Sequence, residues 1–288
     1  MVNRTLARMW IPLTVAAFLP CTGAAAEDFP AILDRASAYV AEFEAQFAAI
    51  IWHETYEQVD RLPLRFGATG GRFTRVGRRL LESEMLFISV DANATWLTVR
   101  DVISVDGKPV PRRLPALLAS KNVSMRDLRA LSEENGHYNI GAIVRNFNEP
   151  TLALLFLDAR YRSRFQFSDG GSGEIGGQVV RKIQFNEVAT PTVIRTQKRD
   201  VRTSGTLLVE PLTGRVLRTE LALIQDESNT RGSIDVSYGM NAKLGLLVPV
   251  EMHEWYGYAH SRPNEGTSCT AKYSDFRRFE TSGGVIIP

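Results

Sequence analysis

Two histidine–glutamate pairs are the first residues in this sequence whose chemistry could serve a metal or an acid–base step. They are His53-Glu54 and His253-Glu254, each inside a run typical of a β-strand. A zinc-binding His-Glu-x-x-His helix would need a second histidine, but Glu57 and Gly257 occupy those positions. Neighbouring side chains of a strand point to opposite faces. We therefore expect solvated polar faces of a sheet here, with no metal and no cofactor.

A second constellation consists of three arginines at alternate positions. Arg160, Arg162 and Arg164 would share one face of a strand expected over Tyr161–Phe167. Such a strip could bind an anionic head group or the carboxylates of a partner. The alternative is a solvated face that pairs with Glu or Asp on a neighbouring strand. The sequence leaves both interpretations open.

We find no sequence motif that indicates catalysis. The segment Gly170–Gly173 contains a serine, but we expect it at a hairpin tip rather than at the strand-to-helix turn of a nucleophile elbow. The surrounding glycine-rich stretch, Asp169–Gly177, precedes no expected helix, so it does not read as a phosphate-binding loop. We expect no enzyme and assign no catalytic residues; a hydrolase is the weakest alternative.

The elements around these residues are mostly strands. Alternating residues and turn signals predict an antiparallel meander at the C-terminal end. Its expected strands are Gly205–Val209, Arg215–Ile224, Ser233–Tyr238, Leu246–Tyr258 and Thr267–Phe279. Further strands are expected at Ile50–Val59, Arg79–Val90, Ala94–Val105, Tyr161–Phe167, Gln178–Val188 and Pro191–Lys198, with a hairpin turn at Asp106-Gly107.

Helices are expected at two places. Apolar residues recur at helical spacing over Ile32–Phe47, before the first strand. The central stretch Pro111–Ala159 is a helical insert. Within it we expect Leu114–Ala119, Met125–Glu134 with a cap from Ser124 and Asp127, and a short helix at Thr151–Leu157. The fold class is therefore α+β: a curved antiparallel sheet, or half-barrel, wrapped over an N-terminal helix and the insert.

Residues 1–26 are predicted to be a secretory signal, with Arg4 and Arg8 before a short apolar run and Ala24-Ala25-Ala26 at the cleavage site. Residues 27–288 then form one domain. Removing the signal leaves 34 − 2 = 32 basic and 32 acidic residues, a balance that argues against nucleic-acid binding. Cys269 becomes the single remaining cysteine, expected to be buried and inert. The predicted location is the periplasm.

The order of elements resembles the periplasmic lipoprotein-carrier superfamily, which contains the outer-membrane lipoprotein-sorting carriers, and within it a branch of secreted bacterial proteins. The resemblance rests on the signal, the N-terminal helix leading into Ile50–Val59, and a closing pattern made by Val209–Arg218, Leu247–Met252 and Ala271–Phe279. It implies a half-open antiparallel barrel over helices that encloses an apolar cavity for acyl chains.

Large mid-strand apolar residues could line such a hollow, or they could simply fill the core. The candidates for a ligand pocket are Trp52, Phe87, Leu97, Phe185, Met252 and Tyr256. We expect a secreted, non-enzymatic binding protein that holds a lipid or acyl group under the sheet, with the insert as a lid. The alternative is an envelope protein–protein interaction module without a small ligand. Contact with a membrane is expected to be peripheral at most.

Overall fold

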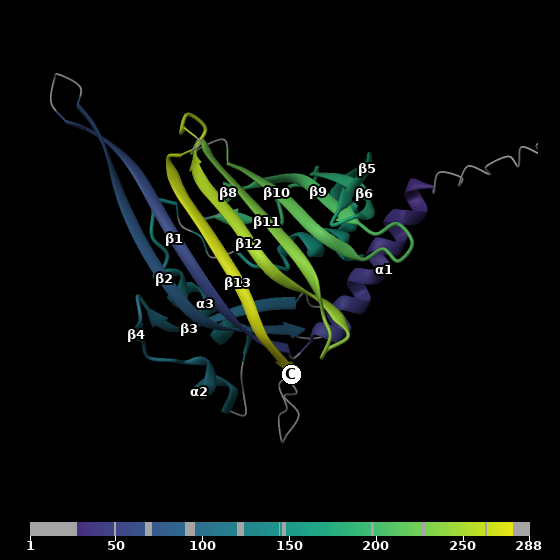
Figure 1. The fold of residues 1–288 in the computed structure, drawn as a ribbon, viewed down its shortest axis with the longest axis horizontal. Coiled ribbons are helices and arrows are strands. Elements are labelled where there is room, and N and C mark those ends of the chain that lie inside the picture. The colour runs from purple at the N-terminus through teal and green to yellow at the C-terminus, as the bar shows by residue number, and fades with distance from the viewer. Residues whose placement is uncertain are drawn as a thin grey trace, which may run out of the picture.

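The computed structural model describes residues 28–48, 50–66, 71–89, 96–119, 124–143, 145, 148–196, 199–225, 228–262 and 264–278. Their main feature is one antiparallel sheet of 11 strands with the order β4-β3-β2-β1-β13-β12-β11-β10-β9-β6-β5 (Figure 1). The two end strands, β4 and β5, do not pair with each other, so the sheet is open. The α+β half-barrel expected from the sequence is therefore confirmed.

The strands of this sheet are β1 Ile50–Phe66, β2 Gly71–Ser89, β3 Trp96–Val105, β4 Lys108–Pro109, β5 Phe165–Ile175, β6 Gln178–Glu187, β9 Arg202–Val209, β10 Val216–Gln225, β11 Thr230–Asn241, β12 Leu246–Tyr258 and β13 Gly266–Arg278. Two short strands, β7 Arg195–Thr196 and β8 Arg199–Asp200, pair separately. The helices are α1 Phe29–Phe47, α2 Leu114–Ala119 and α3 Met125–Gly136, with 3₁₀ helices η1 Leu152–Leu157 and η2 Arg162–Arg164.

The predicted C-terminal meander is confirmed, because β9 to β13 follow one another as neighbours in the sheet. The last of these strands, β13, pairs with β1, so the first and last strands of the described chain are neighbours within the sheet. The hairpin turn at Asp106-Gly107 is also confirmed, with both residues at positive φ. Ser124 and Asp127 form the capping box expected at the start of α3.

Three local predictions were wrong. The strand expected over Tyr161–Phe167 begins only at Phe165, because the preceding residues form η2. Of the strand expected over 191–198, the described part is 191–196, and within it only Arg195–Thr196 pairs as a strand. The stretch 169–177 is mostly strand: β5 pairs with β6 as far as Ile175, since a side chain at Gly170 would lie 2.9 Å from Lys182 Cβ and glycine permits the approach.

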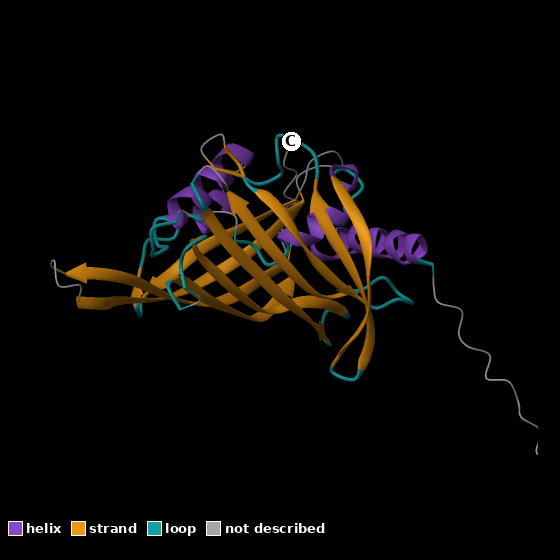
Figure 2. Ribbon diagram, turned by 90° about the horizontal axis from the view of Figure 1, so that it is seen from above, coloured by secondary structure: helices purple, strands orange, loops and turns teal. Residues whose placement is uncertain are grey.

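Two apolar layers cover the sheet. On the inner face, α1 and η1 pack into the main core together with side chains from strands along its length. On the opposite face, α2 and α3 cover the β1–β3 end through a second cluster that includes Ile51, Leu86 and Val99. Figure 2 shows the curved sheet with α1 beside it. Among the described residues no helix has both the length and the apolar character needed to cross a membrane. The predicted signal lies outside them.

Candidate functional site

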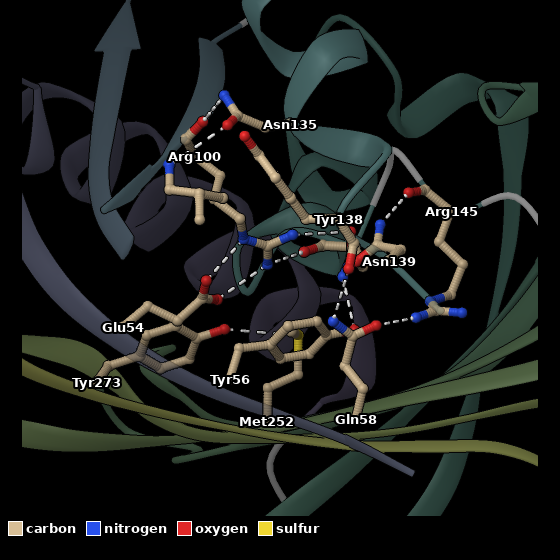
Figure 3. Close-up of polar contacts among 12 residues, drawn as sticks. Glu54, Tyr56, Gln58, Arg100, Asn135, Tyr138, Asn139, Arg145, Met252 and Tyr273 are labelled. Carbon is tan, nitrogen blue, oxygen red and sulfur yellow. Dashed lines mark hydrogen bonds and ion pairs between the residues drawn. The ribbon is translucent and has the colours of Figure 1, made fainter. Parts of the chain in front are cut away.

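Buried polar side chains gather on the inner face of the sheet. Glu54 and Gln58 on β1 are completely buried, and Glu254 on β12 is 4% exposed. Alternation along each strand sends His53 and His253 to the outer face, as expected. The prediction of solvated faces was wrong for the two glutamates, which point into the protein among aromatic neighbours. Figure 3 shows Glu54 and Gln58 together with Arg100 and Arg145.

The strongest contact of this site is an ion pair between Arg100 on β3 and Glu54. Arg100 Nε and Nη2 donate to the two carboxylate oxygens at 2.6 and 2.9 Å. The guanidinium also lies 4.9 Å from the ring centre of Tyr56. Burial alone would lower the pKa of Arg100, but the carboxylate of Glu54 outweighs burial and holds that pKa above its usual value. Two-pronged contacts of this kind fix geometry as well as charge.

Asn148, in the chain that crosses over the sheet, joins this ion pair to the second buried carboxylate. Its side-chain oxygen accepts from Arg100 Nη1 at 3.2 Å. Its amide nitrogen donates to Tyr56 Oη at 3.0 Å and to Glu254 Oε1 at 3.3 Å. The Tyr56 hydroxyl donates to Glu254 Oε2 at 3.2 Å. One asparagine therefore connects three strands, β1, β3 and β12, to the segment above them.

Arg145 is a second cation of this site and is fully buried. Its Nη1 donates to the carbonyl of Ile140 at 2.7 Å, and its Nη2 donates to Gln58 Oε1 at 2.6 Å. Its guanidinium lies 5.1 Å from the ring centre of Tyr256. Among the residues that the structure describes, no carboxylate lies within ion-pair distance of Arg145, and its Nε has no hydrogen-bond partner.

A small polar pocket opens between the sheet and α3. It is lined by Met85, Thr98, Arg100, Ser132, Asn135, Gly136, Asn139, Arg145, Asn148 and Glu149. The centre of a water molecule can move within about 20 Å³ of it, room for about one or two waters and far too little for an acyl chain. At its edge, burial raises the pKa of Glu149 to about 7, against hydrogen bonds from Thr98.

Several buried ionisable groups of this site have shifted pKa values. Burial raises the pKa of Glu254, and Arg145 opposes that change. Burial raises the pKa of the Cys269 thiol to about 12, so this buried cysteine is protonated and inert, as expected. Across the described ranges there is no group of three His, Cys, Asp or Glu side chains placed to hold a metal ion.

Five of the six residues proposed to line a ligand pocket lie together in the main core. Trp52, Phe87, Phe185, Met252 and Tyr256 are at most 3% exposed. They surround the apolar interior rather than the polar pocket. Leu97 is separated from them: it lies on the opposite face of β3 and packs against the second cluster under α2 and α3.

The three arginines of the proposed anionic strip bind different acidic residues. Arg160 pairs with Glu44 at 2.7 Å and with Asp158 at 2.6 Å. Arg162 pairs with Asp34 at 2.8 Å. Arg164 Nε lies 3.7 Å from Glu187. Pairing with acids was the alternative interpretation. Because η2 replaces the expected strand, most of these acids come from α1 and from Asp158, and only Glu187 belongs to a strand.

The sequence did not predict this site, because polar residues of each strand were expected to be solvated. The sequence signal that could have indicated the site is the large apolar residues that flank each glutamate on the same face of its strand. On β1, Glu54 alternates with Trp52 and Tyr56. On β12, Glu254 alternates with Met252 and Tyr256. A carboxylate between two large apolar residues of one face indicates a buried charge that needs a partner, but nothing in the sequence names Arg100 or Asn148 as that partner.

Comparison with known proteins gives a likeness of fold. No family model matches the chain, and no curated protein matches its sequence. A crystal structure described as an outer membrane lipoprotein-sorting protein domain from Vibrio parahaemolyticus is 11% identical, over 88% of this chain and 95% of that chain, with a TM-score of 0.41.

Two further crystal structures are each 11% identical to this chain. A DUF1329 family protein from Desulfovibrio piger matches over 90% of this chain and 96% of its own, with a TM-score of 0.37. A LolA superfamily protein from Nitrosomonas europaea matches over 88% and 94%, with a TM-score of 0.33. These neighbours are of the kind that the sequence resemblance named. The likeness concerns fold alone, and no functional conclusion is drawn from it.

Proposed function

We propose that this chain is a secreted, periplasmic, non-enzymatic binding protein that holds a lipid or acyl group between the inner face of the sheet and the insert 111–159, which acts as its lid. The observation that carries the proposal is the way the hollow is filled. Five consecutive residues of η1, Ala153–Leu157, are buried against the sheet and α1. Apolar space under the sheet is thus occupied by a short segment of the insert.

An acyl chain is a suitable replacement for this segment. The Phe156 ring lies 4.4 Å from the ring centre of Phe165 and 5.3 Å from that of Phe185. If η1 moved away and took Phe156 with it, the rings of Phe165 and Phe185 would face an apolar hollow. Filling the hollow with an acyl chain would bury a similar apolar area, at about 25 cal/mol per Å² in either case. The free energy of burying η1 and that of burying an acyl chain in the hollow would then be similar, so one could replace the other.

The polar site beneath the insert would hold this lid in register. We define residues 148–151 as the anchor segment. Besides Asn148, its Pro150 carbonyl accepts from the Tyr238 hydroxyl at 2.6 Å, and its Thr151 hydroxyl lies 3.2 Å from that of Thr98. The anchor segment immediately precedes η1. Loosening it should therefore release η1 without altering the walls of the hollow.

A fluorescent fatty acid and native mass spectrometry test the proposal. Protein purified from a periplasm is expected to carry a lipid, seen as an added mass. Tyr238→Phe removes one anchor hydrogen bond, worth about 1 kcal/mol, so the fatty acid should bind about fivefold more tightly. Tyr258→Phe, at an exposed tyrosine, is the matched control and should leave binding unchanged. The proposal fails if no lipid co-purifies and neither wild type nor Tyr238→Phe binds the fatty acid.

An envelope interaction module is a second candidate, favoured by one observation. The 11-residue strand β5 ends the sheet, with β6 as its one neighbour in the described sheet order. An open strand edge of this length is a ready site for pairing with an added strand. Ser172→Pro would block such pairing, because proline has no backbone N–H to donate to an added strand. Loss of a protein partner in pull-downs, with fatty-acid binding intact, would favour this candidate.

A further inference from the structure

The outer ends of β1 and β2 form a two-stranded ribbon that projects away from the rest of the sheet (Figures 1 and 2). The pairing of β1 with β13 ends at Arg61, and the pairing of β2 with β3 ends at Leu81. Beyond these points the described strands pair with each other, from Arg61↔Val76 to Phe66↔Gly71. We define the arm as residues 61–66 and 71–80. A ribbon of two strands is marginally stable by itself in water.

Charge is distributed unevenly between the arm and the remaining chain. The sequence from 61 to 80 contains six arginines and no acidic residue. The whole chain has a net charge of +2, so all the other residues together carry +2 − 6 = −4. Arg61 and Arg75 have no ion-pair partner among the described residues. Arg78 has a pair with Glu57 at 3.4 Å, in which both side chains are more than half exposed and screened by solvent.

Apolar side chains stand among these arginines. Leu62, Val76 and Leu80 are 39%, 50% and 38% exposed. The register places Leu62 opposite Arg75 on the inner face of the ribbon, and Val76 opposite Arg61 on the outer face. Both faces of the arm therefore combine positive charge with exposed apolar surface.

This combination fits a bilayer surface better than other anionic partners. A protein docked on one face would leave the apolar residues of the other face in water. A nucleic acid would pair with the arginines but would gain little from the apolar side chains. The interfacial zone of a bilayer surrounds an inserted ribbon, so it can accept apolar side chains from both faces while the guanidinium groups reach lipid phosphates.

We propose that the arm docks this protein on the surface of an anionic phospholipid bilayer. Arginines of the arm such as Arg75 and Arg78 bind lipid phosphates, and Leu62, Val76 and Leu80 enter the interfacial zone. Each basic residue near an anionic membrane contributes to the attraction, and salt screens that contribution. The arm meets the insert at its base, where Arg79 Nη1 donates to the carbonyl of Tyr138 at 3.0 Å. The residues that would enter the bilayer differ from η1 and the anchor segment, so docking and lipid binding under the sheet are tested separately.

Co-sedimentation with vesicles tests the docking. The mature chain is mixed with vesicles of phosphatidylcholine, with or without phosphatidylglycerol. We expect binding to the anionic vesicles alone, weakened at least about tenfold when NaCl rises from about 0.05 M to about 0.5 M. Arg75→Gln with Arg78→Gln should lower the partition coefficient by at least about tenfold. Val76→Thr, which keeps the side-chain shape, should lower it about two- to threefold.

The matched control leaves every residue of the arm unchanged. Arg126→Gln with Arg129→Gln removes two charges from exposed positions on α3 and should bind as wild type does. Circular dichroism of each variant confirms the fold. Docking by the arm is refuted if wild type ignores anionic vesicles, if the arm variant binds as tightly as wild type, or if the α3 variant loses binding equally. Fatty-acid binding, measured in parallel, reports on the other proposal.

Discussion

Single residues of the inner face show how a mostly apolar core accommodates charge. Glu54 is completely buried and is compensated by both prongs of the Arg100 guanidinium. Arg145 relies instead on a carbonyl, an amide oxygen and the face of Tyr256. Buried charges are costly unless they are paired or hydrogen-bonded. These contacts therefore fix the position of the chain above the sheet more than they add to the stability of the fold.

Glu54→Gln tests this balance at the residue scale. The substitution leaves the buried guanidinium of Arg100 without a counter-charge, so the free energy of unfolding should fall by about 3–5 kcal/mol in urea titrations. Replacing both partners, Glu54→Met with Arg100→Met, should cost clearly less than the sum of the single changes.

The exposed ion pair between Glu57 and Arg78 supplies the control for these substitutions of the buried pair. Glu57→Gln removes the partner of Arg78 at the surface and should change the free energy of unfolding by less than about 1 kcal/mol. An equal, small loss for Glu54→Gln and Glu57→Gln would show that the buried pair does not hold the segment above the sheet.

At the scale of elements, the turn between β9 and β10 fixes α1 to the sheet. Arg35 Nε on α1 donates to the carbonyl of Pro211 at 2.8 Å. Gly214, in the same turn, has a φ of +75° and lies against the helix backbone, so that a Cβ there would be 2.3 Å from the Arg35 carbonyl carbon. The Thr-Gly turn that contributed to the sequence resemblance thus has a packing role: it lets a helix approach the end of the sheet closely.

Gly214→Ala should therefore destabilise the protein through two effects. A side chain in the left-handed region costs about 1–2 kcal/mol, and the clash with α1 adds about 1–3 kcal/mol. Gly245→Ala is the matched control, with a φ of +70° and open space around it, and should show the first cost alone. Thermal and urea unfolding measure the difference. Equal losses for the two variants would contradict the close approach of α1.

For the whole molecule, the continuous sheet is the decisive feature. The pairing of β1 with β13 joins the first and last strands, and the inner core contains side chains from α1, η1 and most strands. The arm is the part that leaves this shared core, and it is where positive charge concentrates. A sheet with a projecting basic ribbon is the form that the proposed docking on an anionic bilayer requires.

We expect residues 27–288 to unfold as one cooperative unit, since α1, η1 and most of the described strands contribute side chains to one core. Far-ultraviolet circular dichroism follows the sheet, while fluorescence follows the three tryptophans of residues 27–288: Trp52 on β1, Trp96 on β3 and Trp255 on β12. The transitions should coincide in urea. Two separated transitions would instead divide the chain into more than one domain.

The sequence by itself determined the strands and their antiparallel order, because alternation, turn residues and a helical stripe are local properties of the chain. It did not predict the 3₁₀ turn at Arg162–Arg164, which is tied to acids on α1 and β6. Nor did it predict the length of the arm, since the 62–75 stretch is interrupted by glycine and proline. The tertiary structure decided the site: Glu54 and Arg100 lie 46 residues apart, and Asn148 and Glu254 lie 106 apart. Such partners meet only when the sheet curves and the insert crosses over it, so burial and pairing follow from the fold and not from local pattern.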